Sequence, residues 1–168
     1  MTGRDFDLST VSTTIVVSSD RVLRGERPDR AGPQATAHLE AAGIGRVDTV
    51  VVAEGLEPVA TAVRRALGAG SRFILVLGGT GFGRDNEAPE AVRGLIEVEI
   101  PGIAEQIRAH GLDSTSLSGL SRSVAGVTSR ERGALIVASP GSVGGAKDTL
   151  DVVIPLLGAV FAQLEEER

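Results

Sequence analysis

The sequence contains no cysteine, no tryptophan and no tyrosine. Without cysteine the chain can form no disulfide, no thiolate nucleophile and no cysteine-bound zinc site. Aromatic residues make up only 2% of the chain, which argues against the stacking platforms that hold single-stranded nucleic acid. The net charge of −5 also argues against a nucleic-acid partner or an acidic membrane surface. These totals do not bear on a small anionic ligand, which a few backbone N–H groups and arginines can hold.

Long hydrophobic runs are absent as well. No apolar run approaches the length of a membrane-spanning helix, and the first ten residues, MTGRDFDLST, lack the apolar core of a secretory signal. We therefore expect a cytoplasmic protein. The 168 residues, of which 42% are hydrophobic, are enough for one domain with a sizeable core. We expect the polar residues 1–12 to be flexible and residues 13–168 to form that domain.

Short β-branched runs alternate with amphipathic segments along the chain. Strands are predicted at 13–18, 47–53, 73–77, 124–127 and 134–138, and helices at 34–42, 59–67, 90–96, 102–110, 146–153 and 155–165, with a break at Pro155. Between them, residues 113–123 are predicted to form a loop in which Leu117 and Leu120 dock. This alternation predicts an α/β fold of three layers, with helices on both faces of a mostly parallel sheet.

Four loops that follow strands contain glycine or proline, at 19–33, 54–58, 78–88 and 139–145. Parallel strands place such loops on the same edge of the sheet, where ligands of open α/β sheets bind. We therefore expect one composite site. In the first loop, Asp20 and Arg21 either line this site or cap the loop.

The stretch FILVLGGTGFGRDNEAPE, residues 73–90, combines a buried strand with a glycine turn. Gly78, Gly79 and Gly81 permit positive φ and leave backbone N–H groups accessible, which favours an anion-binding nest. Thr80 adds a hydroxyl, Arg84 a guanidinium suited to phosphate, and Asp85 and Glu87 acceptors for a metal ion or ligand hydroxyls. The alternative is a tight strand-to-helix turn without a ligand, since neither GxxxxGK[ST] nor GxGxxG is present.

The two histidines, His38 and His110, fall in predicted surface helices. Their spacing is not that of metal ligands, so we expect both to be solvated.

Several motifs together resemble the molybdopterin-binding Mog/MoaB family, which includes the G domain of gephyrin. They are GGTGF with PEA, then PGIAEQIR, LSRSVAGV and SPGSVGG, and PDRAGP resembles the early DxSGP motif of the family. The resemblance runs from about Thr13 to Leu164. It implies the MogA/MoaB-like fold, usually as a homotrimer. It also implies transfer of AMP from ATP to the terminal phosphate of molybdopterin with Mg²⁺, and a molybdenum-insertion enzyme as the possible next partner.

The resemblance also assigns roles to residues by motif position. Gly78, Gly79, Thr80 and Gly81 would line the pterin and nucleotide phosphates, and Arg84 would contact phosphate. Asp29 and Gly32 would lie in the early loop near the nucleotide, and Pro89 and Glu90 would close the central loop. Ser121 and Arg122 match the SR turn of the family, and Pro140, Gly141 and Ser142 match its PGxP loop.

Some chemical positions depart from the family pattern. Asn86 stands where the central loop, GGTGxxPRDxTPEA, has an acidic residue, and Glu54 stands at a second acidic position. Asparagine lacks the charge that Mg²⁺ prefers in its ligands. A shift of one position would present Asp85 instead, so we expect Asp85 and Glu54 to be the catalytic metal carboxylates and Asn86 to mark the altered position.

Three functions follow from these residues. The first is a working molybdopterin adenylyltransferase. The second is a protein of the same fold that binds molybdopterin or a protein partner, with adenylylation lost or very slow. The third is a structural trimer without a ligand, which would leave the dense glycine loops without a purpose.

Overall fold

The computed structural model describes residues 6–166. Of the segment 1–12 that we expected to be flexible, residues 1–5 lie outside the described residues. The remainder is more regular than its polarity suggested, with a 3₁₀ turn at Leu8–Thr10 capped by the Asp7 carboxylate. Phe6 packs on Phe161 with ring centroids 5.7 Å apart, and Val11 is buried. These contacts hold the segment beside the last helix.

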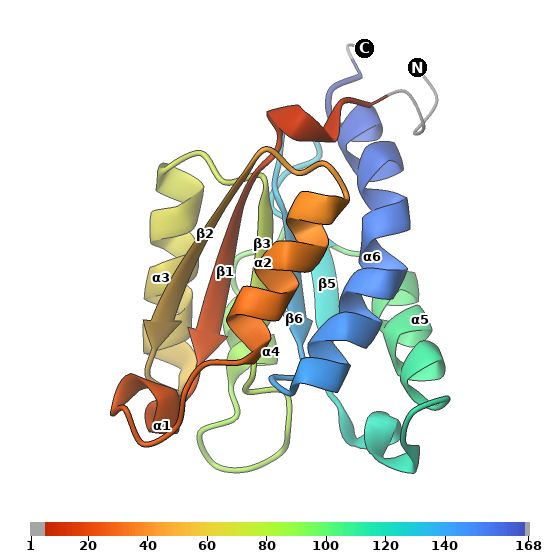
Figure 1. Cartoon of the computed structure of the whole chain (residues 1–168). Coiled ribbons are helices and arrows are strands. Elements are labelled where there is room, and N and C mark those ends of the chain that lie inside the picture. Colours follow the sequence, from red (N-terminus) through yellow and green to blue (C-terminus); the bar gives the residue numbers. More distant parts are fainter. Residues whose placement is uncertain (1–5, 167–168) are drawn as a thin grey trace.

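A single sheet of six strands forms the centre of the molecule (Figure 1). In chain order its strands are β1 (Ser12–Ser18), β2 (Arg46–Val52), β3 (Phe73–Leu77), β4 (Val98–Glu99), β5 (Val124–Val127) and β6 (Leu135–Ser139). Their spatial order is β2-β1-β3-β6-β5-β4. The first four of these strands are parallel, whereas β5 runs antiparallel to both of its neighbours. The prediction of a mostly parallel sheet is confirmed.

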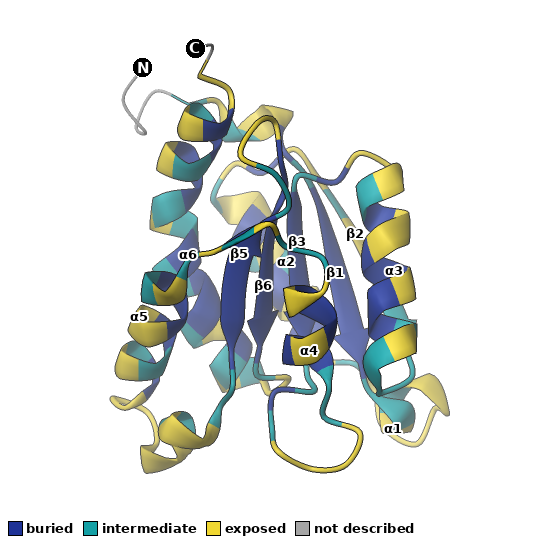
Figure 2. Ribbon diagram, turned by 180° about the vertical axis from the view of Figure 1, so that it is seen from behind, coloured by how far each residue is buried: buried dark blue, intermediate teal, exposed yellow. Residues whose placement is uncertain are grey.

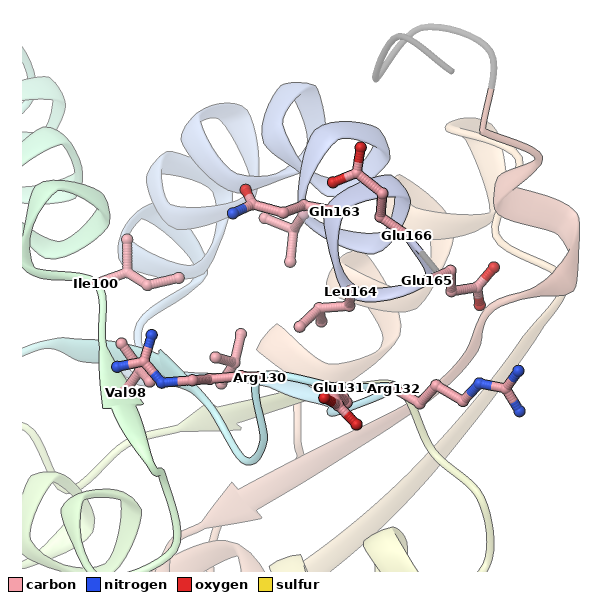
Figure 3. A pocket seen from close by; sticks show the side chains of 11 residues that line it. Val98, Ile100, Arg130, Glu131, Arg132, Gln163, Leu164, Glu165 and Glu166 are labelled. Atoms are coloured by element: carbon pink, nitrogen blue, oxygen red, sulfur yellow. The ribbon is translucent and has the colours of Figure 1, made fainter. Parts of the chain in front are cut away.

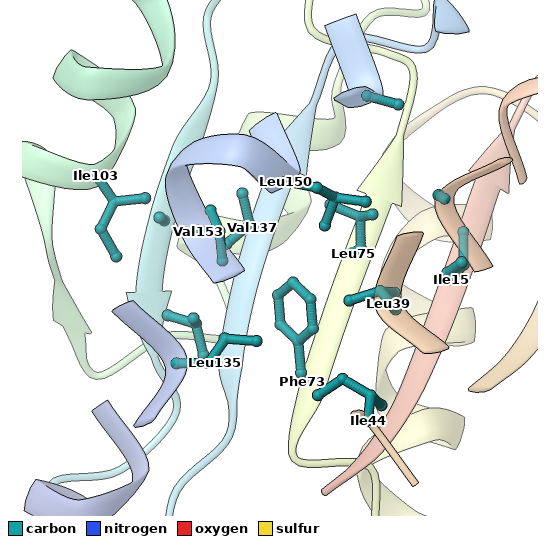
Figure 4. Packing of buried hydrophobic residues seen from close by; sticks show 14 of the residues in the cluster. Ile15, Leu39, Ile44, Phe73, Leu75, Ile103, Leu135, Val137, Leu150 and Val153 are labelled. Atoms are coloured by element: carbon teal, nitrogen blue, oxygen red, sulfur yellow. The ribbon is translucent and has the colours of Figure 1, made fainter. Parts of the chain in front are cut away.

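Helices cover both faces of this sheet, as Figure 2 shows from behind. The helices are α1 (Asp20–Leu23), α2 (Ala31–Ala41), α3 (Leu56–Gly68), α4 (Ala88–Arg93), α5 (Pro101–Gly111) and α6 (Val143–Leu164), with a 3₁₀ helix η2 at Ser116–Leu120. Because side chains alternate along a strand, Phe73 and Leu75 join the core under α2, α5 and α6 (Figure 4), while Ile74 joins the core under α3 and α4. The predicted three layers are therefore confirmed.

Several local predictions were wrong, and the two with the largest structural consequences concern Pro155 and the pair Leu117 and Leu120. Pro155 does not break the last helix, because α6 runs through it with Pro155 on the solvent side and Val153 and Leu157 buried on the core side. Leu117 and Leu120 do not dock, since they are 66% and 54% exposed on η2. That turn is held by polar contacts instead. None of the helices within residues 6–166 is both long and apolar enough to cross a membrane.

Candidate functional site

The carboxyl ends of β1, β2, β3 and β6 all face the same edge of the sheet, at the bottom of Figure 1. The loops after these strands therefore converge, as the sequence predicted. A further segment joins them. Because β5 is antiparallel, Ser121 and Arg122, which lead into it, reach this same edge. We call this edge, with its loops 19–30, 53–55, 78–87, 121–123 and 140–142, the carboxyl edge.

At the carboxyl edge, the ends of three strands touch through bare backbone. Gly78 has φ of +104°, and a Cβ built on it would lie 2.5 Å from the carbonyl oxygen of Ser18. A Cβ on Gly141 would lie 3.0 Å from the Cα of Gly78, and the N–H of Gly78 donates to the carbonyl of Ser139 at 2.9 Å. Side chains are excluded from this junction by its packing, which explains the glycines in both loops.

Polar groups without partners follow this junction. Within residues 6–166, the backbone N–H groups of Gly79, Thr80 and Gly81 have no hydrogen-bond acceptor. The hydroxyl of Ser18 is buried and likewise has no partner among the described residues. It lies 3.7 Å from the position of a Cβ on Gly79. A buried hydroxyl next to free N–H groups matches a nest for an anionic ligand, because a bound oxyanion would satisfy all of them.

The beginning of α6 adds to this nest. Ser142 caps the helix, and its hydroxyl accepts a hydrogen bond from the N–H of Gly145 at 3.0 Å. Ser142 lies in the same short loop as Gly141, which packs against Gly78. The positive end of a helix of 22 residues therefore lies beside the glycine turn, which favours negative charge there.

Arg122 braces the central loop. Its N–H donates to the carbonyl of Thr80 at 2.8 Å, its Nε to the carbonyl of Gly81 at 2.7 Å, and its terminal nitrogens to Asn86 and to the carboxylate of Glu90. The hydrogen bond between the Arg122 guanidinium and the Glu90 carboxylate lowers the pKa of Glu90. The predicted contact of Arg122 with a ligand remains a prediction, and in this structure its guanidinium holds the shape of the nest.

We expect the Arg122–Glu90 pair to stabilise the fold only above acid pH. The pKa of Glu90 is lower in the folded chain than its usual value of 4.5, so its contribution is complete above that value and is lost as the pH falls through the lowered pKa. Both side chains are partly exposed, which limits the effect to under about 1 kcal/mol. Urea unfolding of the native chain and of Glu90→Gln should differ at pH 7 and converge as the pH falls below the lowered pKa of Glu90. Glu105→Gln, on the exposed face of α5, is the control, and a difference that does not change with pH would contradict the assignment.

The other residues of the central loop divide into two groups. Arg84 and Asp85 are exposed at the tip of the loop and free to meet a ligand, whereas Asn86 turns inward and accepts a hydrogen bond from the N–H of Gly83 at 2.9 Å. Pro89 is buried at the beginning of α4, so its part in closing the loop is one of packing.

In the early loop, the carboxylate of Asp29 accepts a hydrogen bond from the N–H of Gly32 at 2.9 Å, which starts α2 at Ala31, earlier than predicted. Gly32 has no room for a side chain, because a Cβ there would collide with that carboxylate. The Asp29 carboxylate therefore stabilises the first turn of α2, and its predicted contact with a nucleotide remains untested.

Asp20 ties the first two loops together, because its carboxylate accepts a hydrogen bond from the N–H of Glu54 at 3.0 Å. Glu54 and Asp85 follow β2 and β3, the two neighbours of β1. Mg²⁺ is usually bound by one or two carboxylates together with water and phosphates. Two single carboxylates suit a Mg²⁺ ion that is shared with a phosphate, and binding of the ion by Glu54 and Asp85 remains a prediction.

Two hollows on the surface of residues 6–166 bear on the location of the site. One of about 330 Å³ lies at the carboxyl edge between α5, η2 and the loop before α6, with Arg108, Ser121, Pro140 and Ser142 in its wall. Sequence reasoning missed both Ser18 and Arg108, whose guanidinium donates to the carbonyls of Ser121 and Ser123 at 3.3 and 3.1 Å. The sequence marked each residue only by its position, since Ser18 ends the strand predicted at 13–18 and Arg108 lies in the helix predicted at 102–110.

A larger hollow of about 920 Å³ lies at the opposite edge, between Arg130–Arg132 and the end of α6 (Figure 3). Volume alone would favour it as the ligand site. We assign the site to the carboxyl edge, because the free N–H groups, the buried Ser18 hydroxyl and the end of the long helix are all there.

Comparison with known proteins agrees with this geometry. Residues 14–159 match the family described as "Probable molybdopterin binding domain". The chain is 33% identical over 158 residues to the "Molybdenum cofactor biosynthesis bifunctional protein" of Synechococcus elongatus, covering 94% of this chain and 49% of that one. It therefore spans about half the length of that relative. It is 28% identical over 141 residues to the "Molybdopterin adenylyltransferase" of Pyrococcus furiosus, covering 83% of this chain and 82% of that one.

Among solved structures, the "Putative molybdenum cofactor biosynthesis protein" of Corynebacterium diphtheriae superposes with a TM-score of 0.86 at 37% identity, covering 93% of this chain and 99% of that one. The likeness in sequence and in fold therefore spans nearly all of the domain. The chain belongs to the molybdopterin-binding family of molybdenum cofactor biosynthesis proteins.

Proposed function

We propose that this protein is a molybdopterin adenylyltransferase, which transfers AMP from ATP to the terminal phosphate of molybdopterin. The observation that carries the proposal is the anion nest at the carboxyl edge, made of the N–H groups of Gly79, Thr80 and Gly81 beside the unpartnered hydroxyl of Ser18. Family membership supports the pterin as the ligand, and the name of the Pyrococcus furiosus relative supports the reaction.

In this reaction a phosphate oxygen of molybdopterin attacks the α-phosphorus of ATP and pyrophosphate leaves. Such transfer depends mainly on positioning the two phosphates and on stabilising the charge of the transition state. The glycine N–H groups and the start of α6 would hold phosphate oxygens, and Arg84 would neutralise a phosphate from the exposed tip of the loop. The pocket walled by Arg108, Ser121 and Pro140 adjoins the nest and would take the pterin.

Asp85 and Glu54 would hold Mg²⁺, which supplies charge neutralisation at the phosphates when bound. Asp85 lies at the exposed tip of its loop, and its carboxylate has no hydrogen-bond partner among residues 6–166 and is therefore available. Glu54 is fixed at its backbone by Asp20. We further expect, from the resemblance, a cytoplasmic homotrimer that passes its product to a molybdenum-insertion enzyme.

The second candidate function is binding of molybdopterin without adenylylation. Asn86 favours this second function. It stands at the family's acidic position but carries no charge, and its side chain accepts a hydrogen bond from the N–H of Gly83 within the loop. The two functions are separated by incubating the protein with molybdopterin, ATP and Mg²⁺ and measuring pyrophosphate. Release supports the transferase, whereas pterin binding without release favours the second function.

We expect Asn86→Asp to raise the rate of pyrophosphate release by about tenfold, the size of a modest electrostatic contribution. Aspartate keeps the acceptor for the N–H of Gly83, so the loop retains its shape while a second oxygen adds charge near the phosphates. Single-turnover kinetics with saturating ATP would measure the change. An unchanged or lower rate would show that this position lies outside the reach of the metal.

A further inference from the structure

The proposed function makes no use of a cluster on the α2, α5 and α6 side of the sheet. It consists of His38 on α2, His110 on α5, and Asp148 and Asp151 on α6. The Nε2 atom of His110 lies 3.3 Å from Oδ2 of Asp151 and 3.6 Å from Oδ1 of Asp148. The Nε2 atom of His38 lies 3.6 Å from Oδ1 of Asp151. Four groups that can bind a metal therefore come from three helices.

These distances are long for ion pairs but suit metal ligands. Charge-assisted hydrogen bonds from nitrogen to oxygen are usually about 2.7–2.9 Å long. In a tetrahedral zinc site the bonds to nitrogen and oxygen are about 2.0–2.1 Å, which sets neighbouring ligand atoms about 3.3 Å apart. The distances of 3.3 and 3.6 Å from the Nε2 atom of His110 to the carboxylate oxygens of Asp151 and Asp148 are thus close to the edge of that tetrahedron.

The charge and burial of the cluster also suit a divalent cation. Two neutral imidazoles and two carboxylates carry a total of −2, which a divalent ion would cancel. The side chain of Asp148 is only 14% exposed and that of Asp151 26%, so neither carboxylate is fully solvated. Lys147 now offsets part of this charge through Asp151 at 2.7 Å, but its own side chain is 67% exposed and can move away.

We propose that His38, His110, Asp148 and Asp151 form a site for a divalent transition metal of the zinc type, which joins α2 and α5 to the first half of α6. His110, Asp148 and Asp151 already place three ligand atoms within 4.8 Å of one another. His38 lies outside that group, 3.6 Å from the other oxygen of Asp151, and would turn toward the ion to complete the set. The expectation that both histidines are merely solvated is revised accordingly. Asp148 also borders the pocket at the carboxyl edge, so the metal would stiffen one wall of it.

The composition makes this proposal easy to test. The chain has no cysteine and only two histidines, and both are in the cluster. Imidazole ligation of a metal by a tag-free protein can therefore arise only here. Titration with Co²⁺, followed by visible absorption, should give the bands of a tetrahedral complex at one ion per chain, and Zn²⁺ should displace them.

Variants define the ligands. His110→Gln and Asp148→Asn should each weaken Co²⁺ binding at least about tenfold, the scale on which metal-site contacts act. Lys147→Met should strengthen it by removing the competing cation, and Asp113→Asn, an exposed carboxylate outside the cluster, should leave it unchanged. The proposal is overturned if no Co²⁺ bands appear, or if binding survives both His110→Gln and Asp148→Asn. Unaltered circular dichroism of each variant excludes misfolding as the cause of lost binding.

Discussion

Asp85→Asn is expected to reduce pyrophosphate release by at least about 100-fold while leaving molybdopterin binding within a few-fold of the native value. Asp85 is exposed at the tip of the central loop and its side chain has no hydrogen bond within residues 6–166, so removal of its charge costs the fold little. The loss falls on the transition state, where removal of a single electrostatic group typically costs a factor of 100 to 1,000, or about 3–4 kcal/mol. Release is measured in single turnover, and binding by titration without ATP.

The matched control is Asp48→Asn. Asp48 is also an exposed aspartate, but it lies in β2 and pairs with Arg46 at the far end of that strand. Its substitution should leave both measurements unchanged. Equal release by Asp85→Asn and the native chain would show that Asp85 holds no metal, and the shifted register of the central loop would then be wrong.

Gly78→Ala is expected to lower the free energy of unfolding by about 2–4 kcal/mol and to abolish ligand binding. The φ of +104° is costly for any residue with a Cβ, by about 1–2 kcal/mol. The new methyl would also lie 2.5 Å from the carbonyl oxygen of Ser18, which belongs to the backbone and cannot rotate away. The end of β1 or the glycine turn must shift, and the nest opens. Urea unfolding at equilibrium measures the first effect and pterin titration the second.

Gly43→Ala separates the strain from the collision. Gly43 also has a positive φ, of +92°, but a Cβ there would meet nothing within 4 Å. It should therefore cost only about 1 kcal/mol and leave ligand binding intact. If Gly43→Ala and Gly78→Ala prove equally destabilising, the close contact of Gly78 with Ser18 does not determine the shape of this edge.

The sequence predicted the frame of the fold because its strands are regular. The run Phe73–Leu77 is buried on both faces, and the structure has the strand with those same bounds. Glycine positions in the loops marked the carboxyl edge for a physical reason, since Gly78 and Gly141 are held where backbones touch. Local rules failed where packing overruled them, as at Pro155, which α6 tolerates because its ring faces solvent.

The details of the site depended on long-range contacts that no local pattern contains. No local pattern around Arg122 predicts its hydrogen bonds to Gly81, Asn86 and Glu90, which lie more than 30 residues earlier in the chain. The match to the SR turn of the family suggested that Arg122 contacts a ligand, whereas its hydrogen bonds are made within the protein. Ser18 reads as the last residue of a strand, and only the structure shows its hydroxyl buried without a partner. The histidines lie far apart in sequence, yet α6 brings both to Asp151.

The proposed function depends on phosphate binding at the glycine turn. The most direct test follows the backbone amide signals of the ¹⁵N-labelled protein by NMR during titration with molybdopterin and Mg²⁺. We predict that the largest shifts occur at Gly79, Thr80 and Gly81, with smaller ones at the start of α6. Shifts confined to Arg130–Arg132, beside the larger hollow at the opposite edge, with those glycines unmoved, would contradict it.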